Sequence, residues 1–189
     1  MAMIMDDITS RLAERIRIER EARGWSLSDL AERSGVSRAM ISKVERGEAS
    51  PTASLLGRLS GAYGLTLSSL LARAETASAE RLRRRESQPV WRDPATGFAR
   101  RAVSPAGLAG IELVEAELPA GARIDYPASA YAFIHQQIWV LDGTLDFTEA
   151  GTTQRLGPGD CLELGPASDC AFANPGSGPV RYLVVVVRR

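Results

Sequence analysis

The spacing of apolar residues changes once along the chain. From Ile8 to about Ala74 they recur every three or four positions, as in Leu12 and Ile16. That period is typical of short amphipathic helices. From Val90 onward the apolar runs are short, rich in β-branched residues and broken by Gly, Pro and Asp. The pattern predicts a helical N-terminal half and a β-rich C-terminal half.

Four runs in the second half are the clearest strand candidates. They are Ile111 to Leu118, Ile134 to Leu141, Thr144 to Thr148 and Arg181 to Val187. Asp142-Gly143 lies between two of these runs, and this dipeptide favours a two-residue hairpin. Residues 90–189 contain no helix pattern long enough for a βαβ unit. We therefore expect an antiparallel sandwich or barrel.

The two patterns predict two domains. We expect residues 1–74 to form an all-α domain of five helices and residues 90–189 an all-β barrel. Residues 75–89 read as a linker that contains Arg81, Arg83, Arg84 and Arg85. We interpret these arginines as a solvated connector rather than as phosphate contacts.

A tight pair of helices is signalled within the first domain. Ser26 and Asp29 have the spacing of a capping box at the start of one helix. That helix would end at Gly35, because glycine is the usual residue for a left-handed C-terminal cap. Ser37 can cap a second helix, which would end near Gly47. Two short helices joined this closely predict a helix-turn-helix, a motif that places its second helix in the major groove of DNA.

The residues of this region resemble those of the XRE family of phage-repressor-like DNA-binding domains. The resemblance covers residues 8–73 and is carried by REARGWSLSDLA at 20–31, SGVS at 34–37, ISKVERG at 41–47 and Pro51-Thr52. It implies that double-stranded DNA is the partner and that eight residues face it: Ser26, Leu27, Ser28, Ser37, Arg38, Ala39, Ser42 and Lys43. Arg38 would pair with guanine, and Ala39 would touch a thymine methyl group.

The same resemblance assigns the interior of the domain. Met40, Ile41 and Val44 are expected in the core, and Arg20 and Glu45 occupy positions that form an ion pair in similar domains. The fourth helix departs from the pattern, because Gly57 and Gly61 replace better helix formers. Each glycine costs about 1 kcal/mol relative to Ala unless close packing compensates.

The second half resembles cupins. The run HQQIWVLDGTLDF at 135–147 is similar to the first cupin motif, and LGPGDCL at 156–162 with FANP at 172–175 is similar to the second. The whole chain thus resembles regulators that join a helix-turn-helix to a cupin. This implies an all-α helix-turn-helix domain followed by an all-β cupin barrel, the double-stranded β-helix.

The metal ligands of many cupins are missing here. The family spacing puts the ligand positions on Ala130, Ala132, Gln136 and Cys170. The single histidine, His135, is expected on the opposite face from Gln136, because side chains alternate along a strand. A divalent transition metal needs three or four N, O or S ligands that converge. We therefore predict no metal, no cofactor and no catalytic residues.

Strand alternation suggests which residues would line a ligand pocket. The candidates are Gln136, Ile138, Val140, Cys170 and Phe172, with Arg123, Tyr126 and Tyr131 at the mouth. A mostly apolar pocket with a few polar groups suits a small organic effector. The alternative is that these residues simply fill a small barrel.

Charge and cysteine content add to this interpretation. Residues 1–100 carry 17 basic and 13 acidic residues, whereas residues 101–189 carry 6 and 10. The excess of basic residues suggests a polyanion partner for the first half only. The two cysteines, Cys161 and Cys170, fit a reducing cytosol, and the apolar run Tyr182 to Val187 is too short to span a bilayer. We expect a cytoplasmic protein with no membrane partner.

Together these features favour a sequence-specific transcription regulator that responds to a small molecule. We expect a homodimer on a pseudo-palindromic operator, with His135, Trp139 and Leu141 on the surface available for contacts between the barrels, although Trp139 fits the core of the barrel equally well. Two alternatives stay open: a cupin enzyme whose helix-turn-helix regulates its own gene, and an antitoxin-like protein whose barrel docks another protein.

Overall fold

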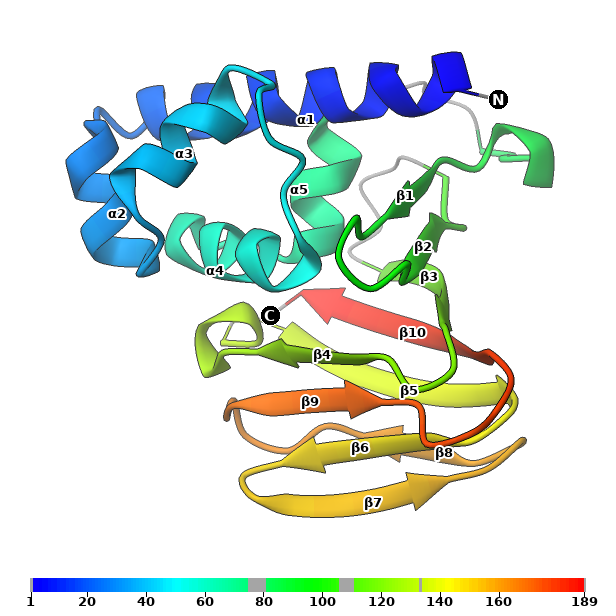
Figure 1. Cartoon of the computed structure of the whole chain (residues 1–189). Helices are drawn as coiled ribbons and strands as arrows, with labels where there is room; N and C mark the ends of the chain where they lie inside the picture. The colour runs from blue at the N-terminus through cyan, green and yellow to red at the C-terminus, as the bar shows by residue number, and fades with distance from the viewer. Residues whose placement is uncertain (1, 75–80, 106–110, 133, 189) are drawn as a thin grey trace.

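The structure is a computed structural model that describes residues 2–74, 81–105, 111–132 and 134–188. The helices form one layer, and the strands form two sheets beneath it (Figure 1). The last helix of the first domain ends at Ala74 and the first strand begins at Val90. Part of the expected linker, residues 75–80, lies outside the described residues.

The helical domain contains α1 (Ala2–Glu21), α2 (Leu27–Ser34), α3 (Arg38–Glu45), α4 (Ala53–Tyr63) and α5 (Leu67–Ala74). Local signals fix several of the boundaries. Ser26 accepts a hydrogen bond from the backbone of Asp29, whose side chain accepts one from Ser26 in return, so the predicted capping box is confirmed. Gly35 ends α2 with φ 66°, as expected for a left-handed cap.

The strands form a six-stranded and a four-stranded sheet. The first has the order β1 (Val90–Arg92), β2 (Ala99–Ala102), β3 (Ile111–Leu118), β10 (Val180–Arg188), β5 (Ile134–Asp142), β8 (Cys161–Glu163). The second has the order β4 (Arg123–Tyr126), β9 (Cys170–Ala173), β6 (Leu145–Glu149), β7 (Thr152–Leu156). Short 3-10 helices, η1 (Arg85–Ser87) and η2 (Ala128–Ala130), precede β1 and β5. All pairings are antiparallel.

The two sheets pack face to face through aromatic residues. Phe172 in β9 stacks on Tyr182 in β10 with 5.8 Å between ring centroids, and Phe147 in β6 lies 4.9 Å from Phe172. Strand β5 alternates between buried and exposed positions over most of its length. The β-rich half is therefore a sandwich of two sheets, and the expected single closed barrel is not formed by the described strands.

The predicted hairpin at Asp142-Gly143 is wrong. Its flanking strands, β5 and β6, belong to different sheets. Gly143 has φ 81°, and a Cβ on it would lie 2.9 Å from Cα of Val180, so this turn is the tight crossing between sheets. The two-residue hairpin is at Ala150-Gly151, where Glu149 pairs with Thr152. Both turn residues have positive φ, as the favoured hairpin turns require.

The helical domain rests on the sandwich through α4. This helix contacts η2 and β4. A Cβ on Gly57 would lie 2.7 Å from Cδ1 of Tyr126, and one on Gly61 would lie 3.0 Å from the carbonyl oxygen of Ser129. Close packing between the domains is therefore the reason for the two glycines that looked unfavourable in the sequence. Among the described residues, no helix is long and apolar enough to cross a membrane.

Candidate DNA-binding surface and ligand cavity

The helices α2 and α3 form a compact pair that contacts directly. Only Gly35, Val36 and Ser37 separate them, and Val36 is buried in the turn. Ser37 accepts a hydrogen bond from the backbone N–H of Met40 at 3.2 Å and so caps α3. The predicted helix-turn-helix is thus present, with α3 in the place of the second helix.

Several of the residues expected to face DNA are exposed on α3. Arg38, Ala39 and Lys43 are exposed, and Ser42 is half-buried. Arg46 donates a hydrogen bond to the hydroxyl of Ser42. The outer surface of this eight-residue helix therefore carries two positive side chains and two small ones. A helix with such a surface can be accommodated in the major groove.

The other expected contacts lie at the helix N-termini. Ser26, Ser28 and Ser37 are exposed at the N-termini of α2 and α3, where the hydroxyls of Ser26 and Ser37 accept hydrogen bonds from backbone N–H groups of the first turn. Such groups attract phosphate oxygens. Leu27 is half-buried and packs against the core, so apolar contact holds most of its side chain inside the domain.

One core prediction is wrong. Ile41 and Val44 are fully buried, but the side chain of Met40 is 39% exposed. Ile41 and Val44 define the buried face of α3, and Met40 lies at its edge, about 100° of helical rotation from Ile41 and about 40° from Val44. An exposed Met40 beside Ala39 adds an apolar side chain to the outer surface of α3, which sequence reasoning missed.

The expected ion pair between α1 and α3 is confirmed. Nε and Nη2 of Arg20 each donate a hydrogen bond of 2.7 Å to one carboxylate oxygen of Glu45. Nη1 of Arg20 also donates to the carbonyl oxygen of Trp25 at 2.9 Å. The side chains are only 12% and 7% exposed. Hydrogen bonding to Glu45 raises the pKa of Arg20, and the pair holds the back of α3 against α1.

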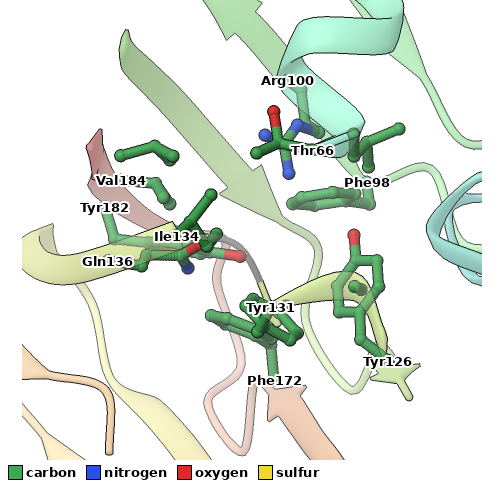
Figure 2. A pocket seen from close by; sticks show the side chains of 13 residues that line it. Thr66, Phe98, Arg100, Tyr126, Tyr131, Ile134, Gln136, Phe172, Tyr182 and Val184 are labelled. Carbon is green, nitrogen blue, oxygen red and sulfur yellow. The ribbon is translucent and has the colours of Figure 1, made fainter. Parts of the chain in front are cut away.

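A cavity lies where the helical domain meets the sandwich (Figure 2). It contains about 30 Å³ of free space, and the hollow to which it belongs measures about 470 Å³ out to solvent. Thr66 and Leu67 enter it from the helical domain. The β-rich domain supplies the rest of the wall: Phe98, Arg100, Tyr126, Ala130, Tyr131, Ile134, Gln136, Phe172, Tyr182, Val184 and Val186.

The structure divides the predicted ligand residues into three groups. Tyr126, Tyr131, Gln136 and Phe172 line this cavity. Arg123 and Cys170 lie instead along an open groove lined by residues of α4, β4 and β9, which Tyr126 also borders. Ile138 and Val140 are fully buried in the core, away from the cavity wall.

Sequence reasoning missed Thr66, Phe98 and Arg100 as wall residues. Thr66 belongs to the helical domain, and Phe98 and Arg100 lie at β2, before the runs that carry the cupin motifs. The burial pattern of β2 has one buried residue followed by three half-buried ones. No two-residue alternation therefore marks Arg100 as a residue that points inward.

Burial dominates the chemistry of the phenols around the cavity. It raises the pKa of Tyr126 to about 12, and it raises the pKa values of Tyr131 and Tyr182 as well. All three are therefore protonated at neutral pH and available as hydrogen-bond donors. The hydroxyl of Tyr126 has no hydrogen-bond partner of normal geometry among the described residues.

The residues at the cupin metal positions do not fit a metal. Ala130 and Ala132 supply no donor atoms, and Gln136 supplies a neutral amide. Burial raises the pKa of the Cys170 thiol to about 12, so the thiolate that a metal requires is disfavoured. His135 is exposed while Gln136 is buried, as strand alternation predicted. Within the described parts of the chain, no three His, Cys, Asp or Glu side chains are grouped as metal ligands.

Two family descriptions match the chain. The helix-turn-helix family matches residues 16–70, and the cupin domain family matches residues 117–186. The HTH-type transcriptional regulator SutR of Escherichia coli (strain K12) is 35% identical over 74 residues, which are 39% of this chain and 42% of SutR. The match therefore spans less than half of the length of this curated relative.

Solved structures resemble the chain over both domains. An HTH_3 family transcriptional regulator from Vibrio cholerae aligns with 97% of this chain and 99% of its own at 22% identity, with a TM-score of 0.77. A hydroxypropylphosphonic acid epoxidase from S. wedmorenis aligns over 95% of this chain and 97% of its own at 16% identity, with a lower TM-score of 0.46. The chain thus matches a helix-turn-helix family in its first half and a cupin domain family in its second half.

Proposed function

We propose that this protein is a sequence-specific DNA-binding transcription regulator. The observation that carries the proposal is the outer surface of α3, where Arg38 and Lys43 are exposed beside Ala39. The buried pair of Arg20 and Glu45 holds the opposite side of α3 against α1. A short helix with a fixed back and a basic front is the arrangement that helix-turn-helix proteins insert into the major groove.

Each group on this surface has a distinct expected partner. Arg38 is suited to the O6 and N7 atoms of guanine, and Ala39 to a thymine methyl group. Lys43 and the serines near the helix N-termini are suited to phosphate oxygens, which orient the protein without reading sequence. Arg38 is therefore the side chain on which base specificity depends most.

The test compares Arg38→Ala with a matched loss of charge elsewhere. DNA fragments that the protein selects from a random pool supply the specific site, and a scrambled duplex of equal length supplies the reference. Arg38→Ala should lower specific affinity by about 1–3 kcal/mol and largely spare binding to the scrambled duplex. Arg155→Ala removes an exposed charge from β7 of the cupin domain and should change neither.

Two results would count against this assignment. Equal losses on both duplexes in Arg38→Ala would make Arg38 a phosphate contact. Failure of the unmodified protein to enrich any sequence would remove the proposed function itself.

We further propose that the cupin domain binds a small-molecule effector and carries out no catalytic step. The cavity between the domains supports the first part, because a ligand there would touch both domains at once. The absence of catalysis is supported by the side chains at the cupin metal positions, which are two alanines, an amide and a protonated thiol.

The outer face of the six-stranded sheet supports a homodimer. Trp139, Leu141, Ile111 and Val187 are 46%, 37%, 54% and 39% exposed. The register puts His135 beside Val187 and Val187 beside Ile111, so the exposed apolar residues span three neighbouring strands. Apolar faces of this kind are typical of protein interfaces, and two copies would present two α3 helices to two half-sites.

Light scattering tests the dimer. The protein should have twice the mass of one chain at micromolar concentration, and Trp139→Asp should yield monomers. Thr153→Asp adds the same charge to the exposed strand β7 and should leave the dimer intact. A monomeric unmodified protein, with and without DNA, would refute this part.

A further inference from the structure

The cavity between the domains has a one-sided polar composition. Its described wall contains one cationic side chain, Arg100, and no carboxylate. Thr66, Gln136 and the phenols Tyr126, Tyr131 and Tyr182 add groups that can donate hydrogen bonds. The remaining wall is aliphatic and aromatic. Such a set of donors is suited to an acceptor-rich, negatively charged group attached to an apolar body.

The Tyr126 hydroxyl is the strongest single indication of a ligand. The residue is 5% exposed, and its hydroxyl is buried without a partner of normal geometry among the described residues. It points toward the side of the cavity that holds Phe98 and Arg100 (Figure 2). Burial raises the pKa of Tyr126, and the charge of the neighbouring Arg100 and a side-chain hydrogen bond with it act in the opposite direction. Both groups can therefore reach one acceptor.

We propose that this cavity binds a small organic monocarboxylate, with the carboxylate held by Arg100 and Tyr126 and the apolar part held by the aromatic wall. This proposal rests on the proposed function, which assumes a small-molecule effector, and it adds the chemical class of that effector. Carboxylate is favoured because a guanidinium and a phenol both donate to its oxygens, and charge-assisted hydrogen bonds are the strong ones. The enclosed free space of about 30 Å³ has room for the carboxylate group alone, so side chains of the aromatic wall must move to admit the apolar part of the ligand.

The same residues connect the cavity to the DNA-binding domain. The ring of Tyr126 lies against Gly57 of α4, and η2, which leads into Tyr131, lies against Gly61. Helix α4 in turn contacts α2. A ligand larger than the free space displaces Tyr131 or the ring of Tyr126, and that movement presses on α4. Carboxylate binding and the placement of the helix-turn-helix are therefore linked.

Calorimetry of the full chain with three benzene derivatives tests the ligand class. Sodium benzoate should bind, and benzamide, which has the same shape without the charge, should bind about ten-fold more weakly. Benzylamine, which reverses the charge, should not bind. Sodium acetate and sodium butyrate extend the series to smaller acids. Equal binding of benzoate and benzamide, preference for benzylamine, or no binding of any of the three acids at millimolar concentration would overturn the proposal.

Two variants locate the site. Tyr126→Phe removes only the hydroxyl and should weaken benzoate by about ten-fold, while the melting temperature without ligand stays the same or rises. Arg100→Gln should abolish benzoate binding, and Tyr126→Phe decides the matter if Arg100→Gln does not fold. Arg123→Gln alters an exposed arginine of the neighbouring groove and should leave binding unchanged. Benzoate affinity unchanged in Tyr126→Phe, or lost in Arg123→Gln, would move the site elsewhere.

DNA binding separates this proposal from the proposed function. Affinity for the selected DNA is measured first without carboxylate, and a failure there concerns the proposed function alone. Benzoate should then change that affinity in the unmodified protein and not in Tyr126→Phe. Benzoate that binds without changing DNA affinity would refute the link through α4 and leave the ligand class standing.

Discussion

The ion pair between Arg20 and Glu45 connects the first helix to the DNA-facing helix. Two hydrogen bonds of 2.7 Å join the guanidinium and the carboxylate, and the side chains are 12% and 7% exposed. Glu45→Ala removes the carboxylate and leaves the arginine in place. Arg20 then retains the carbonyl of Trp25 at 2.9 Å and the carboxylate of Glu21 at 3.5 Å.

The size of the loss follows from this remaining environment. Removing one member of a buried ion pair costs about 3–5 kcal/mol, because the other charge is left uncompensated. Arg20 keeps two partial partners and some solvent contact, so the lower end applies, about 3 kcal/mol. Domains are stable by only about 5–15 kcal/mol. Glu45→Ala should therefore destabilise the helical domain strongly.

Urea unfolding followed by the helical circular dichroism signal measures this loss. The signal reports on the right domain, because the α-helices of the described residues all lie within residues 2–74. Glu48→Ala is the matched control, since it breaks the ion pair of Glu48 with Arg46, whose side chains are 51% and 55% exposed. Exposed pairs are screened by water, so this control should change stability far less. Similar losses in the two variants would show that the Arg20–Glu45 pair is not shielded as its geometry indicates.

Three further outcomes are expected. Gly57→Ala should lower stability although Ala is the better helix former, because its Cβ would lie 2.7 Å from the Tyr126 ring. Replacing the ring by a smaller side chain in Gly57→Ala/Tyr126→Leu should restore part of the lost stability. A Gly57→Ala variant more stable than the unmodified protein would contradict the close contact. Hydrogen bonds with Ser26 lower the pKa of Asp29 from 3.8, so this cap stabilises α2 above pH 3.8, and its contribution is lost as the pH falls through the lower pKa of the folded state. Helicity should therefore fall less steeply with acid in Asp29→Asn than in the unmodified protein, and identical acid titrations of the two proteins would refute this. Elemental analysis of protein purified without chelators or a His-tag should find no stoichiometric metal, and one equivalent that is lost in Cys170→Ala would overturn the assignment of a metal-free cupin.

Local interactions explain what the sequence alone determined. The start of α2, its end at Gly35 and the start of α3 were all predicted, because a cap involves residues within about four positions of one another. The alternation of His135 and Gln136 was predicted for the same reason, since adjacent residues of a strand face opposite sides. The pairing of Arg20 with Glu45 was also correct, but it came from resemblance to a family rather than from local physics.

Contacts between distant segments decided the rest. The dipeptide Asp142-Gly143 has the composition of a hairpin, yet the approach of Val180 makes it the crossing between two sheets. Gly57 looked like a weak helix residue until Tyr126, 69 positions away in the sequence, occupied the space a side chain would need. The cavity wall likewise brings Thr66 of one domain to Arg100 of the other. Such features depend on which surfaces meet after folding, and no local pattern in the sequence specifies that.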